Sequence, residues 1–353
     1  MKNENNNFLV WLKEIAPSSR NFFSFSRYDP TIKSVERSIE KVNRKISTHN
    51  NSNEKSISFE DYENYFDVLK SLGLWEDFEI ITTSDKLIIK GSVIISPLIN
   101  KNNDKIIIFC HGVTNNRWSL FYCIHLVLQM GYRVVIYDAR NHGMSQKSYN
   151  TLGKIESLDL EDVVNWVIKE YKPFKLGFYG FSMGSATLLF WIGQFQDFHP
   201  EVAFVICESP LDDFKERFRN FINVDVLEEK NETWKHYLIY GLAMKVLNSP
   251  VDLIGLKPID FLPKKINFKL LLLHGMKDTV IPVQSSFNIW EKLNKDKVNW
   301  GKVNLYLFDH ADHDEVAFFG DFFANNLRWI KKRDKNSKFC FSSLLFSFLS
   351  KNF

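Results

Sequence analysis

The sequence lacks a dominant charge and a cysteine framework. Its 353 residues carry 45 Lys and Arg against 42 Asp and Glu, which gives a formal net charge of +3. This balance, and the absence of a basic stripe with interleaved aromatic residues, argues against a nucleic-acid partner. The four cysteines form no C-x-x-C pair and show no spacing typical of a metal site. Cysteines that lie in apolar runs are instead typical of small buried side chains in a reducing cytoplasm.

Segments that would direct the chain to a membrane or hold a cofactor are also missing. The apolar run at residues 8–12 stops at Lys13 and has no small-residue cleavage site, so we expect no signal peptide and a cytoplasmic protein. There is no zinc motif, no P-loop and no dinucleotide fingerprint, so we expect no metal and no cofactor.

The longest apolar run near the C-terminus covers residues 339–349, and it is too short to span a bilayer as a helix. Such a run packs on the body of the protein, lies on a membrane surface or joins a partner. Packing is the interpretation that we favour, because an exposed tail of this kind would be a sticky patch.

From residue 78 onward, short apolar runs alternate with longer segments of helical spacing. This alternation predicts βαβ units and a mainly parallel sheet with helices on both faces. The first two strands are expected to form an antiparallel hairpin. The expected strands are residues 78–83, 87–95, 106–110, 134–138, 176–179, 203–207, 270–273 and 303–308. The expected helices are residues 118–130, 160–171, 185–195, 283–293 and 315–332.

These patterns divide the chain into three parts. Residues 1–75 are polar with two stretches of helical spacing, and we expect an N-terminal helical extension. Residues 76–333 form the α/β domain, and residues 334–353 form the apolar tail. Within the α/β domain, residues 211–267 break the rhythm of strands and helices and predict a helical cap over the strand ends. An extra helical layer that packs elsewhere is the alternative.

The stretch Gly180-Phe181-Ser182-Met183-Gly184 lies between an apolar run and a helix-forming run. Strand, sharp turn and helix with a serine at the apex is the arrangement of a nucleophile elbow. The glycines two residues before and after Ser182 leave room for the crowded backbone of such a turn. Ser182 would then stand at a helix N-terminus, where backbone N–H groups favour negative charge.

Polar clusters follow six of the expected strands, at the point where each strand ends. Parallel sheets bind ligands at the carboxyl ends of their strands, so these clusters outline an active site. They begin at His111, Asp138, Ser182, Glu208, His274 and Asp309.

Taken in order, these segments resemble the α/β-hydrolase superfamily, and within it bacterial-type serine hydrolases of the esterase and lipase kind. The resemblance covers the chain from about residue 78 to 332. It implies an α/β-hydrolase fold with a mostly parallel eight-stranded sheet, helices on both faces and a helical lid insertion. The residues that carry it are His111-Gly112-Val113-Thr114-Asn115-Asn116, Arg140-Asn141-His142-Gly143-Met144-Ser145, the Ser182 turn, His274-Gly275 with Asp278, and His313.

A catalytic triad of Ser182, Asp278 and His313 follows from the chemistry and from the family's chain order of serine, acid and histidine. Ser182 is expected to be the nucleophile, His313 the base and Asp278 the acid that orients the base. His310 competes with His313 for the role of base, and His313 matches the family position. The acid has an alternative too, since Glu208 and Asp212 also follow a strand.

Backbone N–H groups of Val113 and Met183 are the expected oxyanion hole. Met183 follows the nucleophile, and Gly112 would let the chain turn closely enough to present the Val113 amide. The histidines that begin H-G turns, His111 and His274, are expected to brace their loops.

The expected function is that of a serine esterase that cleaves a small-molecule carboxylic ester through an acyl-enzyme on Ser182. An apolar acyl chain would suit the Phe-, Trp- and Leu-rich lid. An acyltransferase, a thioesterase or a peptidase on the same scaffold is the alternative among enzymes. A non-catalytic binding protein with this fold is the alternative of another class. Membrane-surface contact through the tail is a separate hypothesis.

Overall fold

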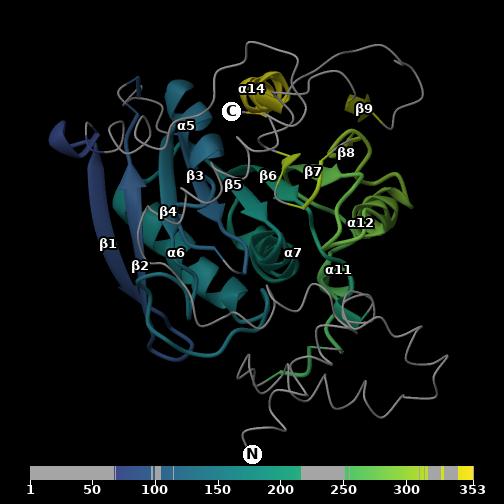
Figure 1. Ribbon diagram of the computed structural model, residues 1–353, viewed down its shortest axis with the longest axis horizontal. Helices are drawn as coiled ribbons and strands as arrows, with labels where there is room; N and C mark the ends of the chain where they lie inside the picture. Colours follow the sequence, from purple (N-terminus) through teal and green to yellow (C-terminus); the bar gives the residue numbers. More distant parts are fainter. Residues whose placement is uncertain are drawn as a thin grey trace, which may run out of the picture.

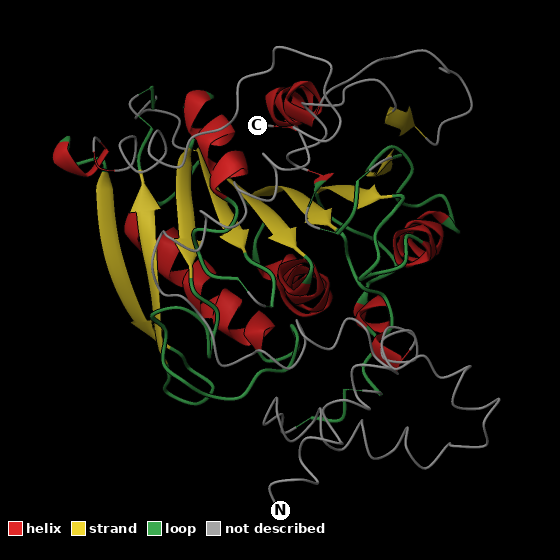
Figure 2. Ribbon diagram, viewed as in Figure 1, coloured by secondary structure: helices red, strands yellow, loops and turns green. Residues whose placement is uncertain are grey.

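The computed structural model describes residues 67, 69–96, 98–99, 105–113, 115–215, 251–253, 255–309, 311–313, 315–316, 327–329 and 341–352. His310, most of the expected cap at residues 211–267 and most of the expected N-terminal extension lie outside these residues. The end of the second expected N-terminal helix is described, and residues 67 and 69–71 are helical. Figures 1 and 2 show the arrangement of the described elements around a central sheet.

Within the described residues, nine strands form one sheet in the order β1-β2-β4-β3-β5-β6-β7-β8-β9. All eight strands that the sequence predicts are present, and the hairpin of β1 and β2 is antiparallel as expected. Strands β3 to β8 run parallel to one another. The strands are β1 (Trp75–Ile81), β2 (Ile88–Ile94), β3 (Lys105–Cys110), β4 (Arg133–Tyr137), β5 (Lys175–Phe181), β6 (Val202–Glu208), β7 (Lys269–Gly275), β8 (Val303–Phe308) and β9 (Leu327–Trp329).

The expected helix at residues 315–332 is wrong in part. Leu327–Trp329 is the short strand β9, which pairs antiparallel with the end of β8 at the edge of the sheet. Most of the remaining residues of that range lie outside the described part of the chain. Strand β9 is only three residues long, and a segment of that length carries no periodicity that could separate strand from helix.

Helices cover both faces of the sheet. Helices α5 and α14 lie on one face, while α6 and α7 lie on the other (Figure 1). The central strands therefore need apolar side chains on both faces: in β3, Ile107 and Phe109 join one core cluster, and Ile106 and Ile108 join the other. The described helices are α5 (Phe121–Gln129), α6 (Glu156–Tyr171), α7 (Met183–Phe195), the 3₁₀ turn η1 (Gln196–Phe198), α11 (Pro258–Phe261), α12 (Gln284–Asn294) and α14 (Phe341–Asn352).

The apolar C-terminal run forms α14, and its apolar side packs on the sheet. Leu344, Leu345 and Leu349 are buried in the same core cluster as α5, and Phe348 meets the ring of Phe204 edge to face, with centroids 5.6 Å apart. The favoured interpretation of the tail, packing on the body, is what the structure has. We therefore propose that the α/β domain includes this helix. No helix in the described part of the chain combines the length and the apolar character needed to cross a bilayer.

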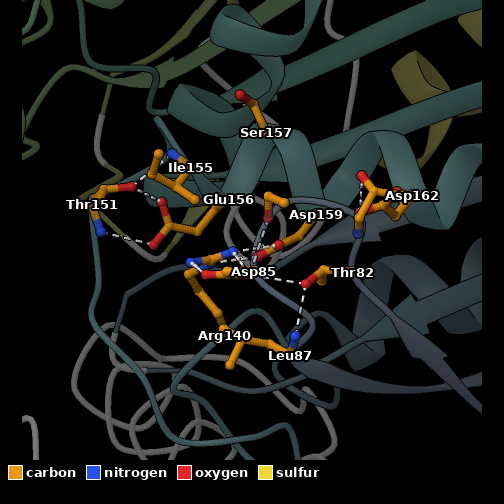
Figure 3. Close-up of polar contacts among 12 residues, drawn as sticks. Thr82, Asp85, Leu87, Arg140, Thr151, Ile155, Glu156, Ser157, Asp159 and Asp162 are labelled. Carbon is orange, nitrogen blue, oxygen red and sulfur yellow. Dashed lines mark hydrogen bonds and ion pairs between the residues drawn. The ribbon is translucent and has the colours of Figure 1, made fainter. Parts of the chain in front are cut away.

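The loop after β4 is fixed by a buried cluster of charges (Figure 3). Arg140 has no exposed side-chain surface, and its guanidinium donates to Asp159 at 2.7 and 2.6 Å and to Asp85 at 2.8 and 3.2 Å. Such a planar group satisfies two carboxylates at once. The cluster thus joins three segments that are far apart in sequence: the β1–β2 turn, the loop after β4 and the first turn of α6.

The second half of the same loop is held by Glu156 at the start of α6. Its carboxylate accepts the backbone N–H groups of Thr151 at 2.8 Å and of Gly153 at 2.9 Å, as well as the Thr151 hydroxyl (Figure 3). An acid in the first turn of a helix also faces the positive end of the helix dipole. The loop therefore enters α6 in one fixed conformation.

The pKa of Asp85 predicts a pH-dependent contribution to stability. Burial opposes ionisation, but hydrogen bonds from Arg140, Thr82 and Tyr149 lower the pKa of Asp85 to about 2. A lowered pKa stabilises the folded state above the unfolded pKa of about 4, and this stabilisation is lost as the pH falls through about 2. Asp85→Asn should lower the free energy of unfolding by about 1 kcal/mol at pH 7, after allowance for solvent screening.

Urea unfolding of Asp85→Asn and of the unmodified protein between pH 3 and pH 7 measures this difference. The gap should shrink toward the acidic end of the range. Glu170→Gln is the matched control, because Glu170 is a surface carboxylate whose nearest cation, Lys169, lies 4.0 Å away. A gap that is independent of pH, or equal in the control, would contradict the role of the Asp85 charge.

Candidate active site

Ser182 stands at the turn between β5 and α7, in a conformation that residues other than glycine rarely adopt. Its φ is 53° and its ψ is −113°. The backbone holds this conformation from both sides: the Ser182 N–H donates to the Glu208 carbonyl at 2.9 Å, and the Ser182 carbonyl accepts the Ala186 N–H at 3.0 Å. Strain of this kind persists only where the surrounding structure fixes it, and it is typical of a nucleophile elbow.

The two glycines that flank the turn are required by close backbone approach. A Cβ at Gly184 would lie 2.0 Å from the carbonyl oxygen of Cys110, and a Cβ at Gly180 would lie 2.7 Å from the backbone of Gly184. Helix α7 can therefore begin directly against the end of β3. The residue types predicted for this turn match the space that the structure gives them.

The structure brings Ser182, His313 and Asp278 together. His313 Nε2 lies 2.9 Å from Ser182 Oγ, and His313 Nδ1 lies 2.8 Å from Asp278 Oδ2. With the proton on Nδ1, the His313 ring donates a hydrogen bond to Asp278 and accepts one from the Ser182 hydroxyl. The three side chains come from the ends of β5, β7 and β8, so they meet at the carboxyl edge of the sheet as expected.

Asp278 is fully buried at its side chain and receives hydrogen bonds on both carboxylate oxygens. Oδ1 accepts the backbone N–H groups of Val280 at 2.9 Å and Ile281 at 2.7 Å. Burial opposes ionisation, but hydrogen bonds from His274 and His313 hold the pKa of Asp278 well below its usual range. The carboxylate is therefore ionised at neutral pH.

Ser209 is a site residue that the sequence analysis missed. Its hydroxyl donates to Asp278 Oδ2 at 2.9 Å, the same oxygen that faces His313. Like Ser182, it has a positive φ, of 46°. It lies immediately after β6, and that placement was the only signal in the sequence.

His274, predicted to brace its loop, also contacts the acid. Its Nε2 lies 3.2 Å from Asp278 Oδ2 and 3.0 Å from the Ile281 carbonyl, and its Nδ1 lies 2.7 Å from the Ser286 hydroxyl. Both partners of Nε2 are acceptor oxygens, so the proton lies on Nε2 and Nδ1 accepts a hydrogen bond from the Ser286 hydroxyl. The ring thereby orients the loop that carries Asp278.

The loops that carry Asp278 and His313 are tied to each other. Asp312 Oδ1 accepts the Thr279 backbone N–H at 2.8 Å, the Thr279 hydroxyl at 2.9 Å and the His313 backbone N–H at 2.8 Å. A Cβ at Gly275 would lie 2.2 Å from the Ala311 carbonyl oxygen, so the two loops also approach closely. This bracing fixes the distance between the acid and the base.

The two residues predicted to present oxyanion donors lie beside the turn. Met183 is the first residue of α7, and its sulfur receives a contact from Asn150 Nδ2 at 3.5 Å. The segment before Val113 is braced by His111, whose Nδ1 donates to the Gly112 carbonyl at 2.7 Å and whose Nε2 accepts the Ala139 N–H at 3.0 Å. Burial lowers the pKa of His111 to about 3, so the ring is neutral.

The other acids that follow β6 have partners elsewhere. Glu208 accepts the Tyr179 hydroxyl, and Asp212 accepts Asn288 Nδ2 at 2.6 Å. Among the described residues, Asp278 is the carboxylate that contacts the imidazole ring of His313. The same part of the chain contains no group of three or more His, Cys, Asp or Glu suited to holding a metal ion.

Comparison with known proteins agrees with the fold. A family model described as the alpha/beta hydrolase fold matches residues 105–223. The uncharacterized protein YqkD of Bacillus subtilis is 29% identical over 211 residues, which cover 59% of this chain and 64% of YqkD. The match thus spans less than two thirds of that relative's length.

Two solved esterases share the fold. The esterase Pf2001 of Pyrococcus furiosus is 25% identical with a TM-score of 0.54, and the match covers 70% of this chain and 87% of the esterase. The esterase EaEST of Exiguobacterium antarcticum is 19% identical with a TM-score of 0.50, over 77% of this chain and 98% of that one. The chain has the α/β-hydrolase fold.

The close approach at Gly184 predicts a large loss of stability on substitution. Gly184→Ala should lower the free energy of unfolding by about 3 kcal/mol or more, because the added Cβ meets a backbone atom that cannot move aside. Gly73→Ala is the matched control: it has a φ of 68° and open space around the Cβ position, so only the strain of about 1 kcal/mol applies. Urea unfolding of both variants measures the difference, and equal losses would contradict the close contact.

Proposed function

We propose that this protein is a serine hydrolase that cleaves carboxylic esters through an acyl-enzyme on Ser182. The observation that carries the proposal is the continuous chain of hydrogen bonds from Ser182 Oγ through His313 to Asp278, at 2.9 and 2.8 Å. A serine hydroxyl is a weak nucleophile, and it becomes reactive when a neighbouring base accepts its proton.

In the first half of the reaction, Ser182 Oγ attacks the ester carbonyl carbon while its proton moves to His313 Nε2. Asp278 remains ionised, holds the proton on His313 Nδ1 and stabilises the imidazolium that forms. The alcohol then leaves with the proton from Nε2, and the acyl group stays on Ser182. In the second half, water gives a proton to His313 Nε2 as its oxygen attacks the acyl carbon. Nε2 then returns the proton to Ser182 Oγ as the bond from the acyl carbon to Oγ breaks and the acid leaves.

Negative charge on the carbonyl oxygen is stabilised by the backbone N–H groups of Met183 and Val113. Each such donor supplies on the order of 3 kcal/mol of transition-state stabilisation. The conformation of the Ser182 turn supports this assignment for Met183, since it begins helix α7 next to the nucleophile. For Val113, support comes from His111, whose Nδ1 donates to the Gly112 carbonyl and so fixes the peptide that carries the Val113 N–H.

An apolar acyl group fits the side chains beside Val113. Leu253 is buried among Val113, Leu152, Val251 and Leu256. Two of these residues belong to the loops next to the turn and three to the described end of the expected cap. Apolar walls of this kind favour an aliphatic acyl chain over a charged one.

Labelling of the full-length protein with a fluorophosphonate probe tests the nucleophile. We expect stoichiometric modification of Ser182, lost in Ser182→Ala and reduced by orders of magnitude in His313→Ala. Ser185→Ala is the matched control, because the Ser185 hydroxyl lies 2.7 Å from the carbonyls of Gly180 and Glu208 and faces away from His313. Labelling of another residue, or equal labelling of the Ser182 variant, would contradict the mechanism.

The reaction class is tested with matched substrates. Hydrolysis of p-nitrophenyl esters of increasing acyl length should exceed hydrolysis of the corresponding thioester and anilide. Faster transfer to an added alcohol than to water would assign the site to an acyltransferase. A folded protein that neither labels nor hydrolyses any of these compounds would leave a binding role.

Ser209 is expected to position the acid rather than to touch the substrate. Ser209→Ala removes the hydrogen bond to Asp278 Oδ2. A hydrogen bond to a charged group contributes about 1.5–3 kcal/mol. If that energy is lost from the transition state, kcat should fall roughly 10- to 100-fold. The KM should stay within about twofold, since Ser209 acts through Asp278. Ser209→Cys, which keeps a weak donor, should recover part of the loss. A change confined to KM would contradict the positioning role.

A further inference from the structure

Large apolar side chains face solvent at the amino ends of the parallel strands, on the side of the sheet opposite Ser182. This side is called the amino edge below. Phe174, Phe198, Val298 and Trp300 are 59%, 72%, 43% and 70% exposed. They lie in the loops that lead into β5, β6 and β8. Because β5 to β8 are parallel neighbours, these loops share the amino edge of the sheet.

Lysines lie next to these rings. Lys175 Nζ is 6.0 Å from the ring centre of Phe174, and Lys297 Nζ is 5.4 Å from that of Trp300. In the part of the chain that the structure describes, neither of these lysines nor Lys172 forms a salt bridge with a carboxylate. Phe174 and Trp300 therefore each have a cation beside them.

The acidic residues of the same loops already have partners. Asp296 lies 3.3 Å from Lys264, Glu201 lies 3.2 Å from His199, and Asp197 accepts Asn267 Nδ2 at 2.7 Å. Asp296 thus lies beside a cation, whereas the partner of Asp197 is a neutral amide that leaves its charge in place. Against that one charge stand Lys172, Lys175 and Lys297, so these loops present a positive charge to a partner. It contrasts with the whole chain, whose formal net charge is only +3.

Hydrogen bonds between the loops hold this edge in one arrangement. Lys269 Nζ donates to the Gly301 carbonyl at 2.9 Å, and Lys302 Nζ donates to the Ile266 carbonyl at 2.8 Å. Asn299 Nδ2 donates to the Lys264 carbonyl at 3.0 Å. A surface that is already ordered loses little conformational entropy when it binds.

We propose that this surface, the basic apolar edge formed by the loops before β5, β6 and β8, docks on an anionic lipid bilayer. Single exposed apolar residues are ordinary, but aromatic rings gathered with lysines on one edge match the boundary between lipid headgroups and acyl chains. Lysines near an anionic bilayer surface are attracted by its negative potential. The active site would then face away from the bilayer and stay open to ester substrates from water.

A bilayer is the partner that we favour because the surface exposes both apolar side chains and lysines. A nucleic acid would match the lysines but would place Val298 and Phe198 against charged phosphates. A bilayer accepts both kinds of group, because the rings enter the headgroup region while the lysine amines remain at its surface.

Co-sedimentation of the full-length protein with vesicles tests the proposal. We expect binding to vesicles of phosphatidylcholine mixed with phosphatidylglycerol, weak binding to phosphatidylcholine alone, and loss of binding at high salt. Phe198→Ser combined with Trp300→Ser should lower partitioning about tenfold or more, and Lys175→Glu combined with Lys297→Glu should do the same.

Ile81→Ser combined with Lys86→Glu is the matched control. Ile81 is 66% exposed at the end of β1, on the carboxyl side of the sheet, so this change removes similar groups from a different edge. Circular dichroism and unchanged fluorophosphonate labelling would establish that each variant is folded.

Equal partitioning of the edge variants and the control, or no binding to either kind of vesicle, would overturn the proposal. Binding to nucleic acid, or self-association measured by light scattering, would also overturn it if the edge variants abolish that binding and no vesicle binding occurs. The vesicle assay does not depend on turnover, so its failure and the failure of the proposed hydrolase chemistry can be told apart.

Discussion

The strained backbone of Ser182 is the constraint on which the rest of the site depends. A positive φ at a residue with a side chain is unfavourable, and it persists here because β3, β5, β6 and α7 meet within van der Waals distance at one point. The strand pairing fixes the direction in which the chain enters the turn, and the contact of Gly184 with Cys110 fixes the direction in which α7 leaves it. The helix that follows then points its free N–H groups toward the place where an oxyanion would form. The order of the strands and the packing of the core therefore determine where the Ser182 side chain and the helix N–H groups lie.

A second constraint is the buried negative charge of Asp278. A carboxylate without exposed surface is costly unless donors surround it, and these donors come from three loops, those after β6, β7 and β8. The charge therefore organises the loops as well as the base. His274 and Asp312 extend the same network away from the reacting atoms, and each has its own partners. This explains how loops, which are the least regular part of the fold, can hold distances near 2.8 Å.

Most of the sheet could be predicted from the sequence because central strands are buried on both faces and read as continuous apolar runs. The residues of the proposed triad could be found because each stands at the end of such a run. Long-range contacts gave no such pattern: the pairing of Arg140 with Asp85 joins residues 55 positions apart, and a single serine such as Ser209 looks like any other. The strand β9 is too short for periodicity, and the packing of α14 depends on an apolar face of the sheet that only the fold reveals.

The two edges of the sheet divide the tasks of this molecule. At the carboxyl edge, polar side chains form hydrogen bonds with buried acids and with the strained turn at Ser182. These hydrogen bonds fix the positions of the groups that make them. At the amino edge, the loops carry only the need to connect helices to strands, so their exposed side chains are free of the demands of the site. Phe174, Phe198 and Trp300 face solvent, and the lysines beside Phe174 and Trp300 form no salt bridge with a carboxylate among the described residues. Because no catalytic contact crosses from one edge to the other, a surface at the amino edge can bind a partner while the site opposite keeps its geometry.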